Sequence, residues 1–407
     1  MADRKAVVIG AGITGVLVSR ELRLAGWDVD LLEAKHVGAG SSSRTAAGIR
    51  QQFSTPGTVR GMRYSVSFYR AFAEETEDGV SPIVQNGYLF LHATEARWAT
   101  AQRTVAMQHE AGLTEVELLD PSAIRARFPW VAEGAAVGAT YCPTDGFLLP
   151  AVVYNEGARR VQALGGRLHQ NAPVTEATVA NGRVVAVHTP KGQFEADLFV
   201  DATNAWTNRL AAMLGAEELP VRAYRRYLWF LARDGSLSAE TLAGMPLTIS
   251  PSGTYCRPEN AETLLMGRKH DTAPEPGFTY EDQDTIETRF SHDGGIDSFP
   301  VELWMELAEV IPGVGEFGGI QATTAGFYAE TPDHNPFLGY DRQRDNVVRL
   351  VGFSGHGAMM GPFTARVARA LAEAGENIDE VEVETGSVGL DAFRIGRVFE
   401  AHEEMVI

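Results

Sequence analysis

Cysteine is scarce in this sequence: its 407 residues include only Cys142 and Cys256. Two cysteines cannot build a disulfide framework or a multi-cysteine metal centre, and we find no metal-ligand spacing elsewhere in the chain. We therefore expect no bound metal and a reducing, cytoplasmic location.

Long apolar runs are missing as well. No run approaches the roughly 18 apolar residues that a membrane-spanning helix needs. The apolar stretch at residues 6–9 is too short for the core of a signal peptide. The sequence thus predicts neither a membrane span nor a secretory leader.

Basic side chains are outnumbered by acidic ones, with 35 Lys and Arg against 53 Asp and Glu, a formal net charge of −18. Such a surface repels phosphate backbones and anionic lipids, which disfavours nucleic-acid and membrane-surface partners. Glycine, by contrast, is abundant, with 42 residues, above its usual share of about 7%. Glycine at this density marks either linkers or backbone that packs closely against a ligand.

The first forty residues predict a nucleotide-binding unit. Residues 5–9 read as a short strand, residues 13–25 as a largely buried helix and residues 29–32 as a second strand. Between strand and helix lies a Gly-x-Gly-x-x-Gly turn, which lets a pyrophosphate approach the backbone and the helix N-terminus. Glu33, after the second strand, can accept hydrogen bonds from an adenosine ribose and disfavours a 2′-phosphate. The predicted contacts are Gly10, Gly12, Ile13, Thr14, Gly15, Glu33, Ala34 and Lys35.

The next segment, residues 37–53, distinguishes between the possible dinucleotides. It is rich in glycine and serine and follows the ribose-binding strand directly. Such a segment can pass beneath a pyrophosphate and along a flavin. It therefore favours FAD over a nicotinamide cofactor, the alternative being a flexible loop. The predicted contacts are Gly40, Ser41, Ser42, Arg44, Thr45, Ala47, Gly48 and Ile49.

A second strand–turn–helix pattern lies near the C-terminus. Residues 348–353 form the predicted strand, and we place Pro362 in the first turn of the following helix, where its missing N–H costs nothing. The helix N-terminus can stabilise a reduced, anionic flavin. Backbone contact with the flavin is expected at Gly352, Gly355 and Gly357. His356 is either a flavin or substrate contact or a buried core histidine.

Together these motifs resemble the D-amino-acid oxidase superfamily of FAD-dependent oxidoreductases, and the resemblance runs along almost the whole chain. The members in question are of the glycine oxidase and sarcosine oxidase type. Residues 48–53 (Gly-Ile-Arg-Gln-Gln-Phe) and Met359-Met360 are most similar to the β subunits of dye-linked L-proline dehydrogenase and sarcosine oxidase. The resemblance implies that Val174, Ala202, Gly326 and Met359 lie beside the cofactor.

The resemblance also implies noncovalent FAD. Gly326 stands where monomeric sarcosine oxidase has the cysteine that bonds the flavin, and no histidine occurs between residues 38 and 53. Met359 occupies the position of a substrate-binding lysine in that oxidase. This weakens a sarcosine-like interpretation and favours a proline-like one.

Three residues are the candidates for substrate contact. Arg50 matches the carboxylate-binding arginine of the sarcosine oxidase pattern, and its planar fork suits a carboxylate. Tyr255 shares one face of a predicted strand with Arg257, a face that is either cavity or solvent. With His356, Arg50 and Tyr255 are predicted to form the catalytic site.

We therefore predict an α/β fold, α+β overall, with a Rossmann-like FAD-binding domain and a second, mainly antiparallel-sheet substrate domain. The FAD domain is assigned to residues 1–80, 146–220 and 325–407, and the substrate domain to 81–145 and 221–324. Within the latter, residues 270–298 are interpreted as a loop or lid entrance.

The predicted activity is oxidation of a small amino acid with a secondary amine, such as L-proline, sarcosine or another N-alkyl amino acid, to the imine by hydride transfer to flavin N5. The alternatives are a flavoprotein β subunit that works only in a hetero-oligomer, a tRNA-modifying amine oxidase and a nicotinamide-dependent reductase. The electron acceptor (oxygen, a quinone or a partner flavoprotein) and the homo- or hetero-oligomeric state stay open.

Overall fold

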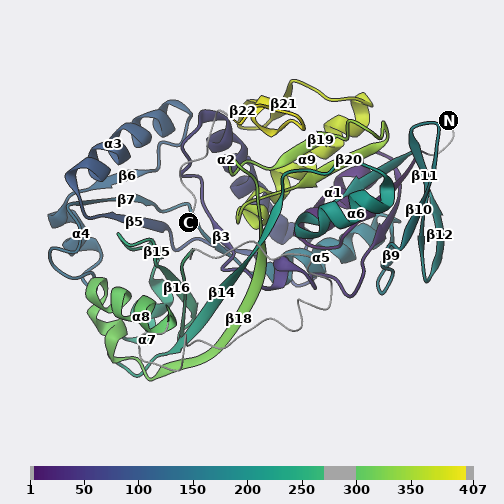
Figure 1. Ribbon diagram of the computed structural model, residues 1–407. Helices are drawn as coiled ribbons and strands as arrows, with labels where there is room; N and C mark the ends of the chain where they lie inside the picture. The colour runs from purple at the N-terminus through teal and green to yellow at the C-terminus, as the bar shows by residue number, and fades with distance from the viewer. Residues whose placement is uncertain (1–3, 270–298, 400–407) are drawn as a thin grey trace.

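A computed structural model of the protein describes residues 4–269 and 299–399 (Figure 1). Two large β-sheets, one mainly parallel and one mainly antiparallel, lie side by side with helices packed around them. This arrangement confirms the predicted α/β class with a Rossmann-like sheet and a second, antiparallel sheet. The predicted loop at residues 270–298 lies outside the described residues.

The mainly parallel sheet has six strands. In spatial order they are β19 (Phe337–Tyr340), β20 (Val347–Val351), β13 (Leu198–Asp201), β1 (Lys5–Ile9), β2 (Asp28–Leu32) and β9 (Arg167–His169). All neighbours in this sheet pair in parallel except β19, which is antiparallel to β20. The carboxyl ends of β1, β2 and β13 therefore meet at one edge, where open α/β sheets bind their ligands.

Alternate residues of β1 face two different cores, because successive side chains of a strand point to opposite sides. Ala6 and Val8 belong to a core shared with residues of the helices on one face, whereas Val7 and Ile9 pack with residues of the elements on the other. The helical side consists of α1 (Ile13–Leu24), α2 (Pro56–Ala71), α5 (Pro150–Ala163) and α9 (Gly357–Ala374). The other side consists of β10 (Glu176–Ala180), β11 (Arg183–Thr189), β12 (Gly192–Glu195) and α6 (Thr207–Leu214). The sheet is thus the middle of three layers.

The second sheet has eight strands. In spatial order they are β18 (Gly319–Glu330), β14 (Arg222–Ala232), β17 (Thr263–Gly267), β16 (Tyr255–Asn260), β15 (Leu247–Ile249), β5 (Tyr88–His92), β7 (Gly138–Cys142) and β6 (Glu117–Leu119). Its neighbours pair antiparallel except β15 and β5, which are parallel. Strands β16 and β17 are neighbours, with Tyr255 opposite Gly267.

The two faces of this eight-stranded sheet are covered differently. One face packs in a core with residues of α4 (Pro121–Arg127), α7 (Ala239–Gly244) and α8 (Phe299–Val310). The opposite face carries Tyr88, Phe90 and Tyr255, which form a separate small core with Leu247 and Leu265. Helix α3 (Glu95–Glu110) contacts β5, β6 and β7.

Two small sheets complete the fold. One joins β3 (Gly48–Ile49), β8 (Gly146–Leu148) and β4 (Ile83–Val84), and the other is the hairpin β21 (Glu380–Val383) and β22 (Gly386–Gly389). Strand β3 leads directly into Arg50. Because β8 pairs with both β3 and β4, the backbone just before Arg50 is held by strands that lie far from it in the sequence. The domain limits given above stay a prediction.

Candidate active site

The glycine turn after β1 is built so that larger residues would not fit. Gly10 has φ +104°, and a Cβ there would lie 2.8 Å from the Ala202 carbonyl oxygen. A Cβ on Gly15 would lie 1.7 Å from the Gly10 carbonyl oxygen. The first and third glycines therefore serve the tight turn and the close packing of α1 that the motif predicts.

A long groove starts at this turn, along the carboxyl edge of the parallel sheet, and extends to β18 and the start of α9. Its walls come from the glycine turn, the end of β2, the segment at residues 39–45 and the connection after β13. The predicted cofactor contacts that line it are Gly10, Gly12, Ile13, Thr14, Glu33, Ala34, Lys35, Gly40, Ser41, Ser42, Arg44, Thr45, Val174, Ala202, Gly326, Gly355 and Gly357. The groove thus brings together segments from both ends and the middle of the chain.

Glu33 lies at the end of β2 with both carboxylate oxygens engaged. Its Oε2 accepts a hydrogen bond from the Ala11 N–H at 2.8 Å, and its Oε1 accepts one from the Lys35 N–H at 2.9 Å. Burial raises the pKa of Glu33, and the two backbone N–H groups oppose that shift. Since a carboxylate has about four acceptor positions, Glu33 can still receive ribose hydroxyls.

The serine-rich segment, which includes the 3₁₀ turn η1 (Ser41–Ser43), is tied to both ends of the groove. Ser42 Oγ accepts a hydrogen bond from the Ile13 N–H at 3.0 Å, and Ser41 Oγ donates one to the Phe327 carbonyl at 2.7 Å. A Cβ on Gly326 would lie 2.9 Å from the Arg44 Cβ. The close approach of this segment to β18 therefore leaves no room for a side chain at position 326.

The turn before α9 forms the other end of the groove. Gly355 has φ +91°, and a Cβ there would lie 2.5 Å from Tyr328 Cε2. Helix α9 begins at Gly357, so Pro362 lies inside the helix, and its predicted place in the first turn is wrong. Proline cannot donate to the Ala358 carbonyl; the Tyr69 hydroxyl donates to it instead, at 2.6 Å.

A smaller cavity adjoins this end of the groove and contains the three predicted catalytic residues, Arg50, Tyr255 and His356. Its other lining residues are Thr45, Ala46, Ala47, Gly48, Tyr88, Leu247, Tyr328, Ser354, Gly355, Ala358 and Met359. Because Thr45, Tyr328, Gly355 and Ala358 also line the groove, the two spaces share a wall. We call this space the Arg50 cavity.

Arg50 is completely buried. Its guanidinium lies 4.0 Å from the ring centre of Phe53 and 5.8 Å from that of Phe90, and Nη1 donates to the Gln52 carbonyl. Its Nη2 donates to His356 Nε2 at 3.4 Å. The guanidinium is therefore held in one orientation by carbonyl, imidazole and aromatic groups.

His356 is buried and also lies on the wall of the cavity, so its burial does not exclude the predicted contact with flavin or substrate. Burial lowers its pKa well below the usual value, and the positive charge of Arg50 lowers it further. Because an arginine can only donate, His356 Nε2 must accept in their contact, which requires the neutral imidazole. The ring of Phe53 meets His356 edge-on, with 5.3 Å between ring centres.

The sequence analysis did not single out Tyr88 and Tyr328, which line the Arg50 cavity beside Tyr255. Burial raises the pKa of both Tyr255 and Tyr328, and the hydrogen bond that the Tyr255 hydroxyl donates to Tyr328 raises the pKa of Tyr255 further. Tyr328 lies two residues after Gly326 on β18, so strand alternation could have placed both on one face. Tyr88 lies on β5, and its ring stacks on that of Phe90 with 5.2 Å between ring centres.

The remaining predicted residues have different places. Ala47, Gly48 and Met359 line the Arg50 cavity rather than the groove. Gly15 packs beneath the glycine turn, Ile49 lies in the core, and Gly352 forms a turn with φ +80° against Thr331. Arg257 is buried, donating from Nε to the Ala46 carbonyl at 2.7 Å. The groove residues that the sequence did not single out are Ile9, Leu32, Ala39, Ala172, Thr203, Asn204, Trp206, Phe327, Tyr328, Ala329, Phe353 and Ala358.

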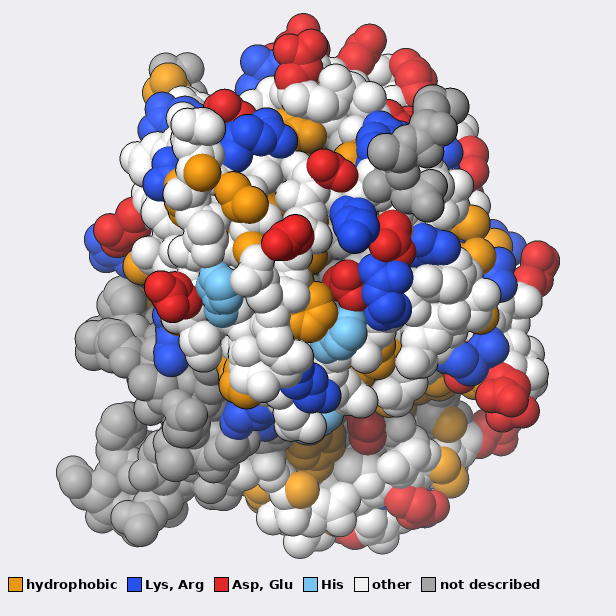
Figure 2. All heavy atoms as spheres, turned by 90° about the vertical axis from the view of Figure 1, so that its right-hand side faces the viewer, with side chains coloured by type: hydrophobic (Ala, Val, Ile, Leu, Met, Phe, Trp, Pro, Cys, Tyr) orange, Lys and Arg blue, Asp and Glu red, His pale blue; other side chains and the backbone are white. Residues whose placement is uncertain are grey.

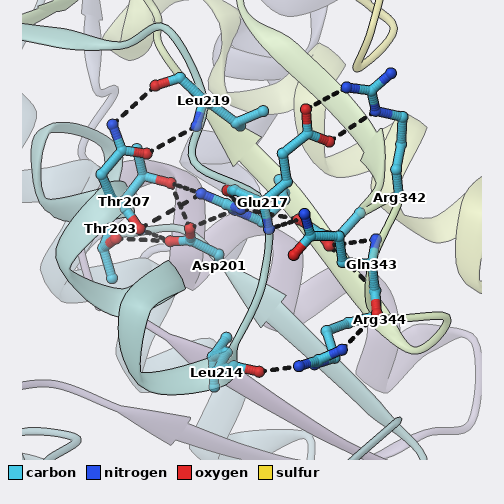
Figure 3. Close-up of polar contacts among 12 residues, drawn as sticks. Asp201, Thr203, Thr207, Leu214, Glu217, Leu219, Arg342, Gln343 and Arg344 are labelled. Carbon is cyan, nitrogen blue, oxygen red and sulfur yellow. Dashed lines mark hydrogen bonds and ion pairs between the residues drawn. The ribbon is translucent and has the colours of Figure 1, made fainter. Parts of the chain in front are cut away.

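An ion-paired cluster holds the connection after β13 in place (Figure 3). Asp201 Oδ1 accepts hydrogen bonds from the Thr203 N–H at 2.9 Å and hydroxyl at 2.6 Å. Arg349, completely buried, donates to Asp201 Oδ2 at 2.9 Å and to Asp341 Oδ2 at 3.0 Å. The cluster fixes the turn that presents Thr203 and Asn204 to the groove.

The surface on the β9–β12 side carries basic and acidic side chains interspersed over most of the visible face (Figure 2). In residues 4–269 and 299–399 no helix is long and apolar enough to cross a membrane. Within the same ranges no group of His, Cys, Asp and Glu residues is arranged to hold a metal ion. Cys142 and Cys256 are buried free thiols.

Comparison with known proteins bears directly on this groove. Residues 5–371 match the family described as FAD dependent oxidoreductase. The match covers both strand–glycine turn–helix units and the Arg50 cavity. The resemblance to the D-amino-acid oxidase superfamily is thereby confirmed.

Individual relatives are moderately similar. The chain is 28% identical to FAD-dependent oxidoreductase domain-containing protein 1 of Bos taurus, covering 90% of this chain and 80% of that protein. It is 26% identical to glycine oxidase of Bacillus licheniformis, covering 89% and 90%. The crystal structure of L-proline dehydrogenase from P. horikoshii superposes with a TM-score of 0.80 at 28% identity, covering 92% of this chain and 94% of that one.

Proposed function

Because the chain belongs to the family of FAD-dependent oxidoreductases, we propose that it oxidises a small amino acid with a secondary amine to the imine. L-Proline, sarcosine and other N-alkyl amino acids are the substrate class. The observation that carries the proposal is a completely buried arginine, Arg50, in a small cavity that shares a wall with the dinucleotide groove.

The groove suits FAD chemically. Gly10 and Gly355 line the groove with backbone that carries no side chain, so a ligand can approach that backbone closely. Glu33 is positioned for the adenosine ribose, and the start of α9 faces the flavin end. Noncovalent binding is proposed because Gly326 has no side chain that could bond to the flavin, and a Cβ there would meet Arg44. When bound, FAD supplies the hydride acceptor at its N5 atom.

Different residues of the Arg50 cavity bind different parts of the substrate. The Arg50 guanidinium pairs with the substrate carboxylate and fixes the α-carbon relative to the groove. Tyr88, Tyr255 and Tyr328 offer ring faces and hydroxyls on the side of the eight-stranded sheet. Met359 and Leu247 add apolar surface that suits a pyrrolidine ring or an N-methyl group better than a second charge.

The protonation state of His356 bears on how the substrate amine loses its proton. A histidine whose pKa lies well below its usual value does not hold a proton near neutral pH. His356 therefore orients Arg50 and does not serve as a strong base. The substrate amine must arrive neutral, or lose its proton to solvent, before its α-hydrogen leaves with the bonding electrons.

Anaerobic bleaching of the flavin absorption tests the proposal. The protein with FAD is mixed with L-proline, sarcosine, glycine or L-alanine, and absorption is followed near roughly 450 nm, where bound flavins absorb. We expect the two secondary amines to bleach the flavin at least about tenfold faster than the primary amines, about 1.4 kcal/mol in transition-state binding. Bleaching by none of them, or faster bleaching by glycine, would contradict the proposed substrate class.

Failure to bleach has a second cause that must be separated. A β subunit that works only in a hetero-oligomer would bind FAD and yet show activity only in its native assembly. Mass measurement of protein purified from its source distinguishes the cases, because a hetero-oligomer contains a second polypeptide. The electron acceptor is then identified by supplying oxygen, a quinone or a dye to the bleached protein.

A further inference from the structure

A third cavity lies outside both the groove and the Arg50 cavity, along helix α3. Its volume is about 390 Å³, against about 140 Å³ for the groove and about 40 Å³ for the Arg50 cavity. The lining residues are Gln52, Ser54, His92, Ala96, Arg97, Thr100, Ala101, Thr104, Val105, Gln108 and Thr140. We call it the α3 cleft. In Figure 1, α3 lies above β5 and β7, at the end of the molecule away from β10–β12.

The inner end of the α3 cleft carries a hydrogen-bond acceptor that its surroundings leave unused. Gln108 is 1% exposed, and its Nε2 donates to the Phe53 carbonyl at 2.9 Å. That bond fixes the orientation of the amide, so Oε1 is the atom left for another contact. Oε1 is buried and has no hydrogen-bond partner among the residues that the structure describes. A buried acceptor in this state costs free energy until a donor reaches it.

The outer end is positively charged. Arg97 is exposed and donates from Nη1 to the Pro251 carbonyl at 2.8 Å, which holds the guanidinium at the mouth of the cleft. Burial lowers the pKa of His92 to about 4, and the charge of Arg97 contributes to that shift. His92 is thus neutral at physiological pH, and its buried Nε2 is a second polar atom without a partner within residues 4–269 and 299–399.

The wall between the two ends is apolar. Ala101 and Val105 are buried one helical turn apart on the same face of α3. Thr100 and Thr104 turn their hydroxyls back to helix carbonyls, at 3.1 Å and 3.2 Å. These threonines therefore contribute mainly methyl surface to a ligand. A flat, apolar body fits such a wall better than a strongly hydrated one.

We propose that the α3 cleft is a second ligand site, for a small aromatic carboxylic acid with a neutral hydroxyl or N–H donor at the opposite end. The carboxylate pairs with Arg97 beside His92, the ring packs on Ala101 and Val105, and the donor reaches Gln108 Oε1. A cation would be repelled by Arg97. A plain hydrocarbon would leave Gln108 Oε1 buried without a donor.

The site is separate from the proposed chemistry but adjacent to it. Gln108 holds the backbone of Phe53, whose ring lies beneath the Arg50 guanidinium. Binding in the α3 cleft can therefore be measured without turnover and does not depend on the proposed substrate. Because the Arg50 cavity also attracts carboxylates, the test must distinguish the two sites.

The probe is 4-hydroxyphenylacetate, titrated calorimetrically into the protein with FAD bound. Phenylacetate lacks the donor and 4-methylphenol lacks the carboxylate, so each should bind at least about tenfold more weakly. Arg97→Gln should weaken 4-hydroxyphenylacetate at least about tenfold and leave 4-methylphenol unchanged. Gln108→Met should weaken it similarly and leave phenylacetate unchanged. A variant that weakens binding of 4-hydroxyphenylacetate but not of the analogue lacking one group identifies that group as the one the side chain contacts.

The flavin spectrum shows which cavity is filled. We expect saturable binding without a change in flavin absorption. The proposal is overturned if the wild-type protein shows no saturable binding, or if binding perturbs the flavin and survives Arg97→Gln. Since Arg97 is exposed, its variant should fold even where Gln108→Met, which loses the Phe53 contact, does not.

Discussion

Arg50 and Arg349 are both completely buried, and the contacts described for them differ in kind. Arg349 lies between the carboxylates of Asp201 and Asp341 and also donates to the Thr207 side chain. Arg50 donates to a carbonyl and to a neutral imidazole and lies over the ring of Phe53, on the wall of a cavity. The first is a structural arginine paired within the fold. For the second, we propose a role in binding the substrate carboxylate.

The difference teaches that burial alone does not reveal what a charged side chain does. Burying a cation is costly unless opposite charge and hydrogen bonds compensate it. Around Arg349 the compensation is complete within the protein, and the result is a fixed turn after β13. At Arg50 the groups named above orient the guanidinium on the wall of the cavity, where we propose that it pairs with the substrate carboxylate.

The same substitution at both positions should separate the two roles, and the largest effect is expected for Arg50→Met. We expect kcat/KM for the substrate identified by flavin bleaching to fall about a thousandfold, about 4 kcal/mol, since a buried carboxylate would lose its charged partner. Steady-state kinetics with the FAD-loaded protein measure this. Flavin content should stay close to that of the wild-type protein. Unchanged turnover would remove Arg50 from the substrate site.

Arg349→Met should instead lower stability, by about 3 kcal/mol, because it leaves Asp201 and Asp341 buried without their shared cation. Urea unfolding followed by tryptophan fluorescence measures the loss. Turnover per bound flavin should remain within about threefold of wild type, because the Arg50 cavity keeps all its residues. If Arg50→Met destabilised the fold as much as Arg349→Met, the distinction between the two arginines would be wrong.

How well the sequence predicts each part of the molecule depends on how far apart in the chain the interacting residues lie. The glycine turn and Glu33 are local patterns, and each motif residue serves a turn, a helix start or a strand end within about thirty residues. They could be read directly. The two sheets followed from strand periods and from the resemblance, and both are confirmed.

The tyrosines and the Arg349 cluster depend on contacts between distant segments. Tyr328 enters the Arg50 cavity only because β14 pairs with β18 along its length, and Tyr88 only because β5 lies beside β15. Pro362 was misplaced since the helix start is set by the glycine turn, while Tyr69, from another helix, supplies the missing donor. No local pattern contains these partners.

The smallest effect is expected for Asp145. Its carboxylate holds Gln51 and Gln52, the two residues after Arg50, and takes no part in the guanidinium contacts described above. Asp145 is fully buried, and its Oδ1 accepts from Gln51 N–H and Nε2, both at 2.9 Å, while Oδ2 accepts from Gln52 Nε2 at 3.2 Å. Burial raises the pKa of Asp145 to about 6. Asp145 thus holds the two residues after Arg50 through neutral amides, whereas Asp201 and Asp341 contact Arg349 directly.

A raised carboxyl pKa gives a definite sign to the pH dependence. The folded state keeps the Asp145 proton up to about pH 6, whereas the unfolded chain releases it near pH 4. The contribution of Asp145 to stability is therefore full below pH 4 and is lost as the pH rises to about 6 and above. Asp145→Asn cannot titrate, so its stability relative to wild type should improve by about 2 kcal/mol between pH 4.5 and 7.

Urea unfolding of both proteins at four pH values across this range measures the difference. The exposed helix cap Asp120 supplies the matched control: hydrogen bonds from Ser122 and Ala123 lower its pKa. Asp120→Asn should therefore show a constant difference from wild type between pH 5 and 7. A flat difference for Asp145→Asn as well would mean that Asp145 is ionised in the folded protein throughout this range. Gln51 and Gln52, the two residues after Arg50, would then be anchored by a permanent buried charge, and the difference between this region and the region around Arg349 would be smaller than we infer.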